Sequence, residues 1–252
     1  MKLKIETGRV IVCASAACMG QGLGTVLVQI VAEATSLPKS VIGVHAPDTM
    51  VTPNSGTSTA SRQTLVTGEA ARTAGIALSE DLKNHSLEML EGKEYYREYD
   101  CVTDPMNSAK PNRLSHVAYG YATQVVILGD DGRVRRVVAA HDVGKAINPN
   151  GVEGQIEGGV VMGLGYALTE DFKVHNGAPA VTLGTLGLFR STQVPQIDCR
   201  IIEKNSATLA FGAKGVGEIV MVTTAPAVAG AYYRRDGKFR TSLPLKETPY
   251  SR

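Results

Sequence analysis

Apolar positions alternate in short runs and follow helical stripes in longer ones, so both strands and helices are expected. Near the start of the chain, residues 9–15 and 40–48 are rich in β-branched side chains and predict strands. Residues 25–36 predict a helix with Thr25 as its N-cap. The apolar side chains that share one face of this helix are Val26, Leu27, Ile30, Val31 and Ala34.

A longer helical pattern follows a polar loop at residues 52–61. It begins near Leu65, carries apolar residues through Leu82, and is expected to end near Gly92. Charged and turn-forming residues are frequent from residue 83 to residue 112. The sequence therefore predicts a boundary between two lobes in this region.

The second part of the chain begins with a predicted hairpin at residues 119–144, where two β-branched runs flank an Asp-Asp-Gly turn. A helix is expected over residues 152–168, after a turn at Pro149. Residues 196–204 predict another strand, and residues 224–235 predict a final helix.

The helix at residues 152–168 is rich in glycine. Each interior glycine costs about 1 kcal/mol relative to alanine, so we expect another element or a ligand to pack very close to its backbone. The chain as a whole is predicted to be an α+β protein with two lobes of mixed β-sheet and packed helices, divided as residues 1–95 and 96–252. The glycines of the helix are Gly154, Gly158, Gly159, Gly163 and Gly165.

Composition excludes several classes of function. The 26 basic and 24 acidic residues nearly cancel, which argues against nucleic acid or acidic lipid as a partner. The 4 cysteines form no CxxC pair, so zinc or iron–sulfur ligation within this chain is not expected, and a reducing cytoplasm is. No apolar stretch is long enough for a membrane span. A strand begins within a few residues of Met1, which suits a fragment or a subunit whose neighbour supplies the preceding part.

Three glycine-rich loops, at residues 19–25, 52–61 and 212–218, lie next to predicted helices or strands. None has the spacing of a dinucleotide or P-loop fingerprint, which disfavours kinases and nicotinamide-dependent dehydrogenases. Each loop alone is compatible with a structural turn. Together they favour a large polar cofactor held by neutral hydrogen bonds. The uncharged donors near the loops are Gln21, Ser58, Ser61, Gln63 and Gln155.

The third loop, FGAKGVGEIV, delivers Glu218 into an apolar run. One interpretation is a turn followed by a strand with Glu218 on its exposed face. The other is a general base in dry surroundings, where burial raises the pKa of a carboxyl group. Lys214 is compatible with either an anion partner or a surface charge. His116 and His141 are expected in strands as packed or surface residues rather than ligands.

Four motifs in order resemble the molybdenum-binding subunit of xanthine dehydrogenase and related molybdenum hydroxylases. The similarity extends over nearly the whole chain and corresponds to the C-terminal half of that family's molybdenum region. It is strongest toward bacterial xanthine dehydrogenases described as selenium-dependent. The motifs are MGQGLGTVLVQIVAEA, DTMVTPNSGTSTASRQTLVTGEA, VEGQIEGGVVMGLGYALTEDF and FGAKGVGEIVMVTTAPAVAGAYY.

The resemblance implies a fold of the molybdenum cofactor-binding domain type and a role for each loop. Glu218 matches the catalytic glutamate that deprotonates the molybdenum-bound hydroxyl, and Ala60 matches the residue whose backbone lies beside the metal. The resemblance implies that the molybdopterin is bound by Gly20, Gln21, Gly22, Ser58, Ala60, Ser61, Gln63, Gln155, Gly215 and Gly217.

The implied reaction is hydroxylation of a purine such as xanthine, with water as the oxygen source. The implied cofactor is a molybdenum-bearing molybdopterin, with its cytosine dinucleotide form left open. Iron–sulfur clusters and FAD are expected only in partner subunits or domains, beside the missing N-terminal half. Two alternatives stay open: another N-heterocycle or an aldehyde as substrate, or a non-catalytic assembly fragment. Exposed apolar surface on an isolated chain would favour homo-oligomers.

Overall fold

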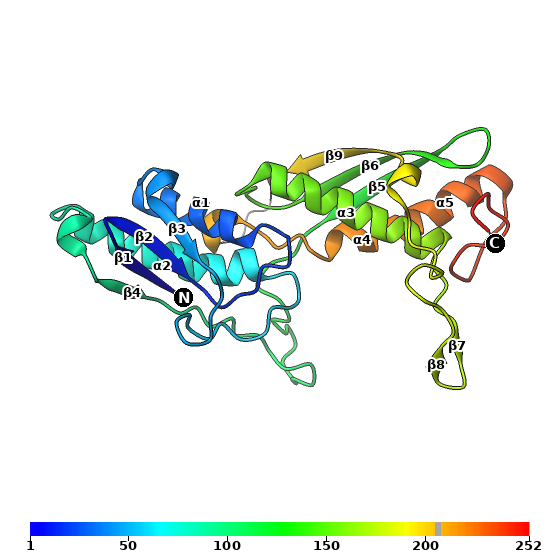
Figure 1. The fold of residues 1–252 in the computed structure, drawn as a ribbon. Helices are drawn as coiled ribbons and strands as arrows, with labels where there is room; N and C mark the ends of the chain where they lie inside the picture. Colours follow the sequence, from blue (N-terminus) through cyan, green and yellow to red (C-terminus); the bar gives the residue numbers. More distant parts are fainter. Residues whose placement is uncertain (205–207, 252) are drawn as a thin grey trace. The chain divides into compact units, whose positions relative to one another are not determined.

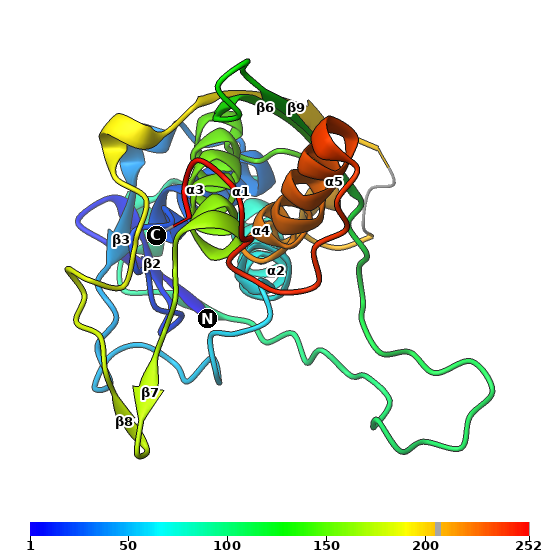
Figure 2. The same ribbon diagram turned by 90° about the vertical axis from the view of Figure 1, so that its right-hand side faces the viewer.

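The computed structural model describes residues 1–204 and 208–251, which form two compact units (Figure 1 and Figure 2). The first unit comprises Met1–Gly120, Val143–Gly151 and Glu203–Gly215. The second comprises Tyr121–Asp142, Val152–Ile202 and Val216–Arg252. Each unit contains a mixed sheet with packed helices, so the predicted α+β class is confirmed. The division into domains at residues 95/96 stays a prediction.

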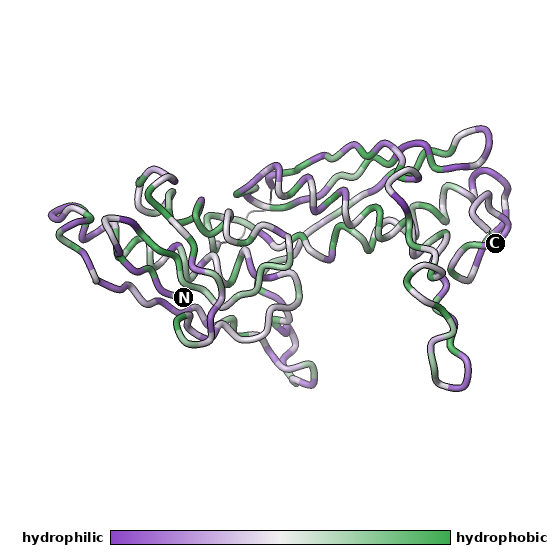
Figure 3. Tube along the Cα trace, viewed as in Figure 1, coloured by the Kyte–Doolittle hydropathy of each residue, from purple (hydrophilic) through white to green (hydrophobic). Residues whose placement is uncertain are grey.

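The first unit contains a four-stranded sheet in the order β3-β2-β1-β4. β2 (Arg9–Cys13) pairs antiparallel with β1 (Lys2–Glu6) and parallel with β3 (Ile42–His45), and β4 (Glu94–Tyr96) pairs antiparallel with β1. The predictions for β2 and β3 are confirmed. The strand expected within a few residues of Met1 is confirmed as β1, whose residues KLKIE alternate between hydrophilic and hydrophobic (Figure 3).

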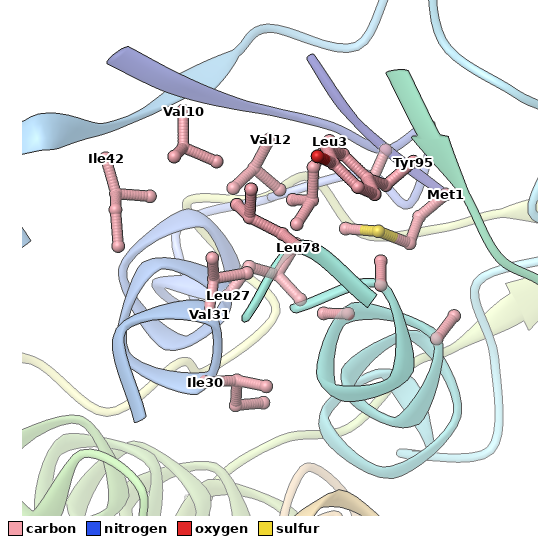
Figure 4. Packing of buried hydrophobic residues seen from close by; sticks show 14 of the residues in the cluster. Met1, Leu3, Val10, Val12, Leu27, Ile30, Val31, Ile42, Leu78 and Tyr95 are labelled. Atoms are coloured by element: carbon pink, nitrogen blue, oxygen red, sulfur yellow. The ribbon is translucent and has the colours of Figure 1, made fainter. Parts of the chain in front are cut away.

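Helices α1 (Leu23–Thr35) and α2 (Gln63–Leu82) enclose the core of this unit together with the sheet (Figure 4). A short 3₁₀ turn, η1 (Lys39–Val41), leads from α1 into β3. Removing these side chains from water is the main stabilising contribution in this unit. The core side chains labelled in Figure 4 are Met1, Leu3, Val10, Val12, Leu27, Ile30, Val31, Ile42, Leu78 and Tyr95.

Two predicted boundaries in this unit are wrong. Thr25 lies inside α1, and the N-cap is Gly22, whose left-handed φ of 78° a glycine adopts without strain. The second helix ends at Leu82 rather than near Gly92, and the 3₁₀ turn η2 (Glu88–Leu90) follows it. Gly92 turns the chain into β4 and donates its N–H to the carbonyl oxygen of Ile5 at 2.9 Å.

The buried carboxylate of Glu69 ties α2 to a distant segment of the same unit. Arg72 donates two hydrogen bonds, of 2.8 and 2.7 Å, to the Glu69 carboxylate, which is 5% exposed. The N–H of Ala210, in the 3₁₀ turn η4 (Ala210–Gly212), donates a third at 2.7 Å. Burial alone would raise the pKa of Glu69, but these donors outweigh burial and hold the pKa below its ordinary value.

The second unit contains the three-stranded sheet β5-β6-β9. β6 (Val134–Asp142) pairs antiparallel with β5 (Ala122–Leu128) and parallel with β9 (Gln196–Ile202). The predicted hairpin and the predicted strand are therefore confirmed. His141 is completely buried on β6. His116 does not lie in a strand, because residues 105–121 form a loop.

Helices α3 (Pro149–Leu168) and α5 (Thr224–Asp236) pack under one face of this sheet (Figure 2). The final helix is confirmed, and the single-turn α4 (Ile219–Val222) precedes it. α3 begins at Pro149 rather than Val152, because the fixed φ of proline suits the first position of a helix.

Three further elements of the second unit lie outside its core. The 3₁₀ turn η3 (Ser191–Gln193) leads into β9. The small β7 (Val174–His175) and β8 (Ala178–Pro179) hairpin has a hydrophilic tip (Figure 3). Among the helices within the described residues, none combines the length and hydrophobicity of a membrane span.

The close packing predicted for the glycine-rich helix is confirmed at two positions. A Cβ added to Gly159 would lie 2.3 Å from Cγ2 of Val220, and one added to Gly163 would lie 2.5 Å from Cβ of Thr224. Gly154 has no atom within 4 Å of such a Cβ. The glycines therefore serve two purposes: one face of α3 receives α4 and the start of α5, and another is open.

Candidate functional site

The first glycine-rich loop presents open backbone at two positions. Gly20 has φ 111° and Gly22 has φ 78°, and a Cβ added to either residue would meet no atom within 4 Å. The side chain of Gln21 is fixed within the loop, because its Oε1 accepts the N–H of Met19 at 2.5 Å. A polar ligand can thus approach the backbone at Gly20 and at Gly22, on either side of the ordered side chain of Gln21.

Three predicted site residues converge on Ala17. The carbonyl oxygen of Ala17 accepts hydrogen bonds of 3.0 Å from Nε2 of Gln21 and 3.0 Å from Nε2 of Gln63. The N–H of Ala17 donates to Oγ of Ser58 at 3.4 Å. Gln21 Nε2 also donates to Oε1 of Gln63 at 2.7 Å. The structure thus brings two loops far apart in sequence into one hydrogen-bonded cluster, whose centre the sequence analysis missed.

The second loop ends in a strained turn that a glycine closes. Ala60 and Ser61 have consecutive left-handed φ values of 57° and 51°, which are uncommon for residues with a side chain. Gly215 packs against this turn so closely that an added Cβ would lie 1.2 Å from the carbonyl oxygen of Ser61. Gly215 is therefore required for close approach, which holds the turn in place.

An open pocket of about 270 Å³ adjoins the second loop in the first unit. Ser58 and Gln63 line it, together with Arg62, Tyr99 and Asp100. The lining is predominantly polar. Arg62 adds a guanidinium group to the neutral hydrogen-bond donors of the two loops. This residue was not predicted from the sequence.

The exposed Cys18 thiol stands beside the first loop. The backbone N–H of Gly20 lowers its pKa below the ordinary value, because hydrogen bonding favours the thiolate. Burial, reinforced by repulsion from Glu157 and Glu153, raises the pKa of Cys199 to about 11.

We expect iodoacetamide to alkylate Cys18 with a pH midpoint below that of a free cysteine, about 8.5, and Cys199 with a midpoint well above it. The thiolate is the reacting species, so the rate rises as pH passes through each pKa. Mass spectrometry of peptides from the purified protein, labelled from pH 6 to pH 10, measures the midpoint of Cys18 and shows whether labelling of Cys199 is still far from its plateau at pH 10. A midpoint for Cys18 at or above that of a free cysteine would contradict the prediction.

Lys214 is buried, with 6% of its surface exposed, which is inconsistent with a surface charge. Its Nζ donates a hydrogen bond of 2.8 Å to the carbonyl oxygen of Tyr119 in the same unit. A buried ammonium group requires such acceptors, because water no longer solvates it.

Glu218 and Gln155 belong to the second unit. Glu218 occupies the N-cap of α4, and its side chain is exposed rather than buried in dry surroundings. Its carboxylate makes no hydrogen bond or ion pair with any residue that the structure describes. Gly217 precedes it in the same turn and is also exposed. Gln155 is half-buried on α3, next to the open backbone of Gly154.

The predicted residues therefore fall into two groups. The second unit holds Gln155, Gly217 and Glu218, and the first holds the others. Both groups contain neutral amides and glycines. The first also contributes hydroxyl groups, and the second contributes the carboxylate of Glu218, which has no partner among the described residues. The residues in the first unit are Gly20, Gln21, Gly22, Ser58, Ala60, Ser61, Gln63 and Gly215.

Open glycine backbone and neutral hydrogen-bonding side chains on mixed-sheet units indicate a protein that binds a polar cofactor. The chain belongs to the molybdopterin cofactor-binding domain family, which it matches over residues 1–104 and 88–195. It is 32% identical to the 6-hydroxypseudooxynicotine dehydrogenase complex subunit gamma of Paenarthrobacter nicotinovorans, over 90% of this chain and 33% of that protein. It is 28% identical to the putative xanthine dehydrogenase molybdenum-binding subunit XdhA of Escherichia coli, over 95% of this chain and 37% of that protein.

Solved structures agree with this family. The crystal structure of the aldehyde oxidoreductase from Desulfovibrio desulfuricans superposes with a TM-score of 0.80 at 25% identity, over 92% of this chain and 27% of that one. The chain thus spans about a third of the length of these relatives.

Proposed function

We propose that this chain is the C-terminal molybdopterin-binding part of a molybdenum hydroxylase, an oxidoreductase that hydroxylates a purine such as xanthine with water as the oxygen source. The observation that carries the proposal is the convergence of Gln21, Ser58 and Gln63 on Ala17 within a chain of the molybdopterin family. The convergence supports it because these residues come from two glycine-rich loops and the start of α2, and carry the neutral hydrogen-bonding groups that a pterin needs.

The residues of the site fit a molybdopterin. Gly20 and Gly22 leave open space where side chains would stand, so a flat ring system can approach the backbone. The amides of Gln21 and Gln63 bond each other and Ala17, which leaves one hydrogen of Gln63 Nε2 and a second lone pair on each Oε1 for a pterin edge. Arg62, on the neighbouring pocket, offers a cation for a phosphate.

Each group of residues has a proposed role. The cofactor-binding residues proposed in the first unit are Gly20, Gln21, Gly22, Ser58, Ser61, Gln63 and Gly215, and those proposed in the second unit are Gln155 and Gly217. In this proposal, Ala60 is the residue whose backbone would lie beside the bound metal. When bound, the molybdenum cofactor supplies the two-electron oxidation of the substrate carbon.

Glu218 is proposed as the proton acceptor. Its carboxylate is exposed at the start of α4 and has no partner among the described residues, so it is available to take up a proton at Oε. A carboxylate engaged in an internal ion pair would not be free to accept a proton from a ligand.

The substrate class is an electron-poor N-heterocycle. Similarity to XdhA favours a purine such as xanthine. The relative named for 6-hydroxypseudooxynicotine favours a nicotine-type compound as the second candidate, and similarity to the aldehyde oxidoreductase of Megalodesulfovibrio gigas adds aldehydes.

The proposal also covers the assembly. The partners are the N-terminal half of the molybdenum region and iron–sulfur and flavin subunits or domains, in keeping with relatives that are named as subunits of complexes. The four free cysteines favour a cytoplasmic location. The proposal leaves open whether the enzyme contains selenium and whether its pterin carries a cytosine nucleotide; analysis of the native complex decides both.

A metal and pterin assay tests the proposal. We expect molybdenum and pterin in the complex with the partner subunits, and much less in the chain alone, because the relatives are about three times its length. Elemental analysis of the same sample measures selenium, and turnover with xanthine, nicotine-type compounds and aldehydes decides the substrate class. Absence of molybdenum from the complete native complex would overturn the proposal and leave an assembly role.

A further inference from the structure

Gln124 is a polar residue on the inward face of β5. It pairs with the buried Ala139 of β6, and its neighbours on the same face, Val126 and Leu128, pack against the core. A polar side chain at such a position destabilises a fold unless its hydrogen bonds are made. Both ends of the Gln124 amide are bonded, so the residue replaces an apolar core contact with two directed hydrogen bonds.

Both of these bonds go to the single turn of α4 and the residue that opens α5. Nε2 of Gln124 donates to the carbonyl oxygen of Val220 at 3.0 Å. Oγ1 of Thr224 donates to Oε1 of Gln124 at 2.8 Å. A helix of one turn leaves most of its carbonyl groups without partners inside the helix, so an external donor stabilises it.

The same two residues are seated on α3. Val220 is 2% exposed and Thr224 is fully buried, and the missing side chains of Gly159 and Gly163 make the room for them. Van der Waals contact with α3 fixes the distance of α4 from that helix. The Gln124 amide adds the directional constraint that close packing alone does not supply.

The orientation of Glu218 depends on this turn. Glu218 is the N-cap of α4, and its carbonyl oxygen accepts the N–H of Met221 at 3.1 Å. Its side chain makes no hydrogen bond with the described residues. The position and direction of its Cα–Cβ bond are therefore set only by the backbone of the α4 turn.

We propose that Gln124 is a positioning residue, which holds α4 through Val220 and Thr224 and thereby orients Glu218. The inference rests on the proposed function in one respect, the role of Glu218 as proton acceptor. It also makes a claim that is independent of catalysis: the amide of Gln124 limits the opening of the α4 turn.

The test uses the assembled holoenzyme and compares Gln124→Ala with Thr123→Ala, an exposed neighbour on the opposite face of β5. We expect Gln124→Ala to lower kcat about 10- to 100-fold, the effect of a small displacement of a catalytic group, with KM changed less than about twofold and molybdenum content unchanged. Hydrogen exchange of the amides at residues 219–223 is expected to accelerate in this variant and not in the control.

A second variant, Gln124→Glu, separates positioning from general damage to the core. A carboxylate can accept from Thr224, but it can donate to Val220 only when it is protonated. The ratio of its kcat to that of the wild type is therefore expected to rise as pH falls, whereas general damage would leave the ratio independent of pH. If Gln124→Ala does not assemble, Gln124→Glu and Thr224→Val carry the test by the same measurements.

The outcomes distinguish the two hypotheses. Wild-type kcat and wild-type exchange in the Gln124 variants, in an enzyme that Glu218→Gln inactivates, would overturn the positioning role and leave the proposed function intact. Full activity of Glu218→Gln would overturn the role of Glu218 and with it the catalytic part of the inference. Accelerated exchange with lowered kcat, confined to the Gln124 and Thr224 variants, supports the inference.

Discussion

Glu218→Gln is expected to lower kcat of the assembled enzyme by about 10²- to 10⁴-fold, the usual contribution of a general base. Glutamine keeps the size and the polarity of the side chain but does not accept a proton at neutral pH. Because the carboxylate is exposed and makes no hydrogen bond within the described chain, its loss should leave the fold and the molybdenum content unchanged. Steady-state kinetics and metal analysis of the same preparation check both statements.

The matched control for this prediction is Glu33→Gln. Glu33 is also an exposed glutamate, on α1, and the substitution removes the same charge. We expect wild-type turnover from the control. Turnover by Glu218→Gln within about twofold of the control would contradict the role of Glu218.

Gly215→Ala is expected to have the largest effect on stability. The new Cβ would lie 1.2 Å from the carbonyl oxygen of Ser61 and 2.5 Å from its carbonyl carbon, and backbone atoms cannot rotate away as a side chain can. We expect the free energy of unfolding to fall by about 3 kcal/mol or more, which corresponds to a melting temperature lower by roughly 6–12 °C. Scanning calorimetry of the purified protein measures this change.

Gly24→Ala provides the control in the same unit. The added Cβ would lie 3.7 Å from the side chain of Val44, which is an ordinary contact, and alanine favours the helical backbone of α1. We expect the control to be neutral or more stable by up to about 1 kcal/mol. A melting temperature for Gly215→Ala equal to that of the control would mean that Ser61 can move without cost.

Periodicity and turn residues predicted the strands and helices well where one face is apolar over several turns. They failed where the conformation of the backbone, rather than the type of side chain, determines where a helix begins or ends. Gly22 caps α1 because its backbone has a left-handed φ. The sequence does not show which glycines adopt this conformation, so Thr25 was the expected cap. Gly92 ends no helix but turns the chain toward β4, because a long-range bond to Ile5 fixes it there.

The candidate site shows the same limit. Gln21, Ser58 and Gln63 are identifiable from their motifs, but their common partner is the backbone of Ala17, and every residue has such a backbone. The apolar run after Glu218 suggested a buried carboxylate. The run is a helical turn, which directs only Val220 fully into the core and leaves Glu218 at the exposed end.

The order in which the chain builds its two units has a consequence for synthesis and for genes. Three segments of each unit alternate along the sequence, so the chain passes between the units five times. The Glu69 carboxylate meets the N–H of Ala210 only after residue 210 has left the ribosome, because the two residues are 141 positions apart in the sequence. The first unit therefore cannot finish folding before its last segment, Glu203–Gly215, has been synthesised, and a single cut of the gene anywhere between residues 121 and 203 leaves neither unit whole.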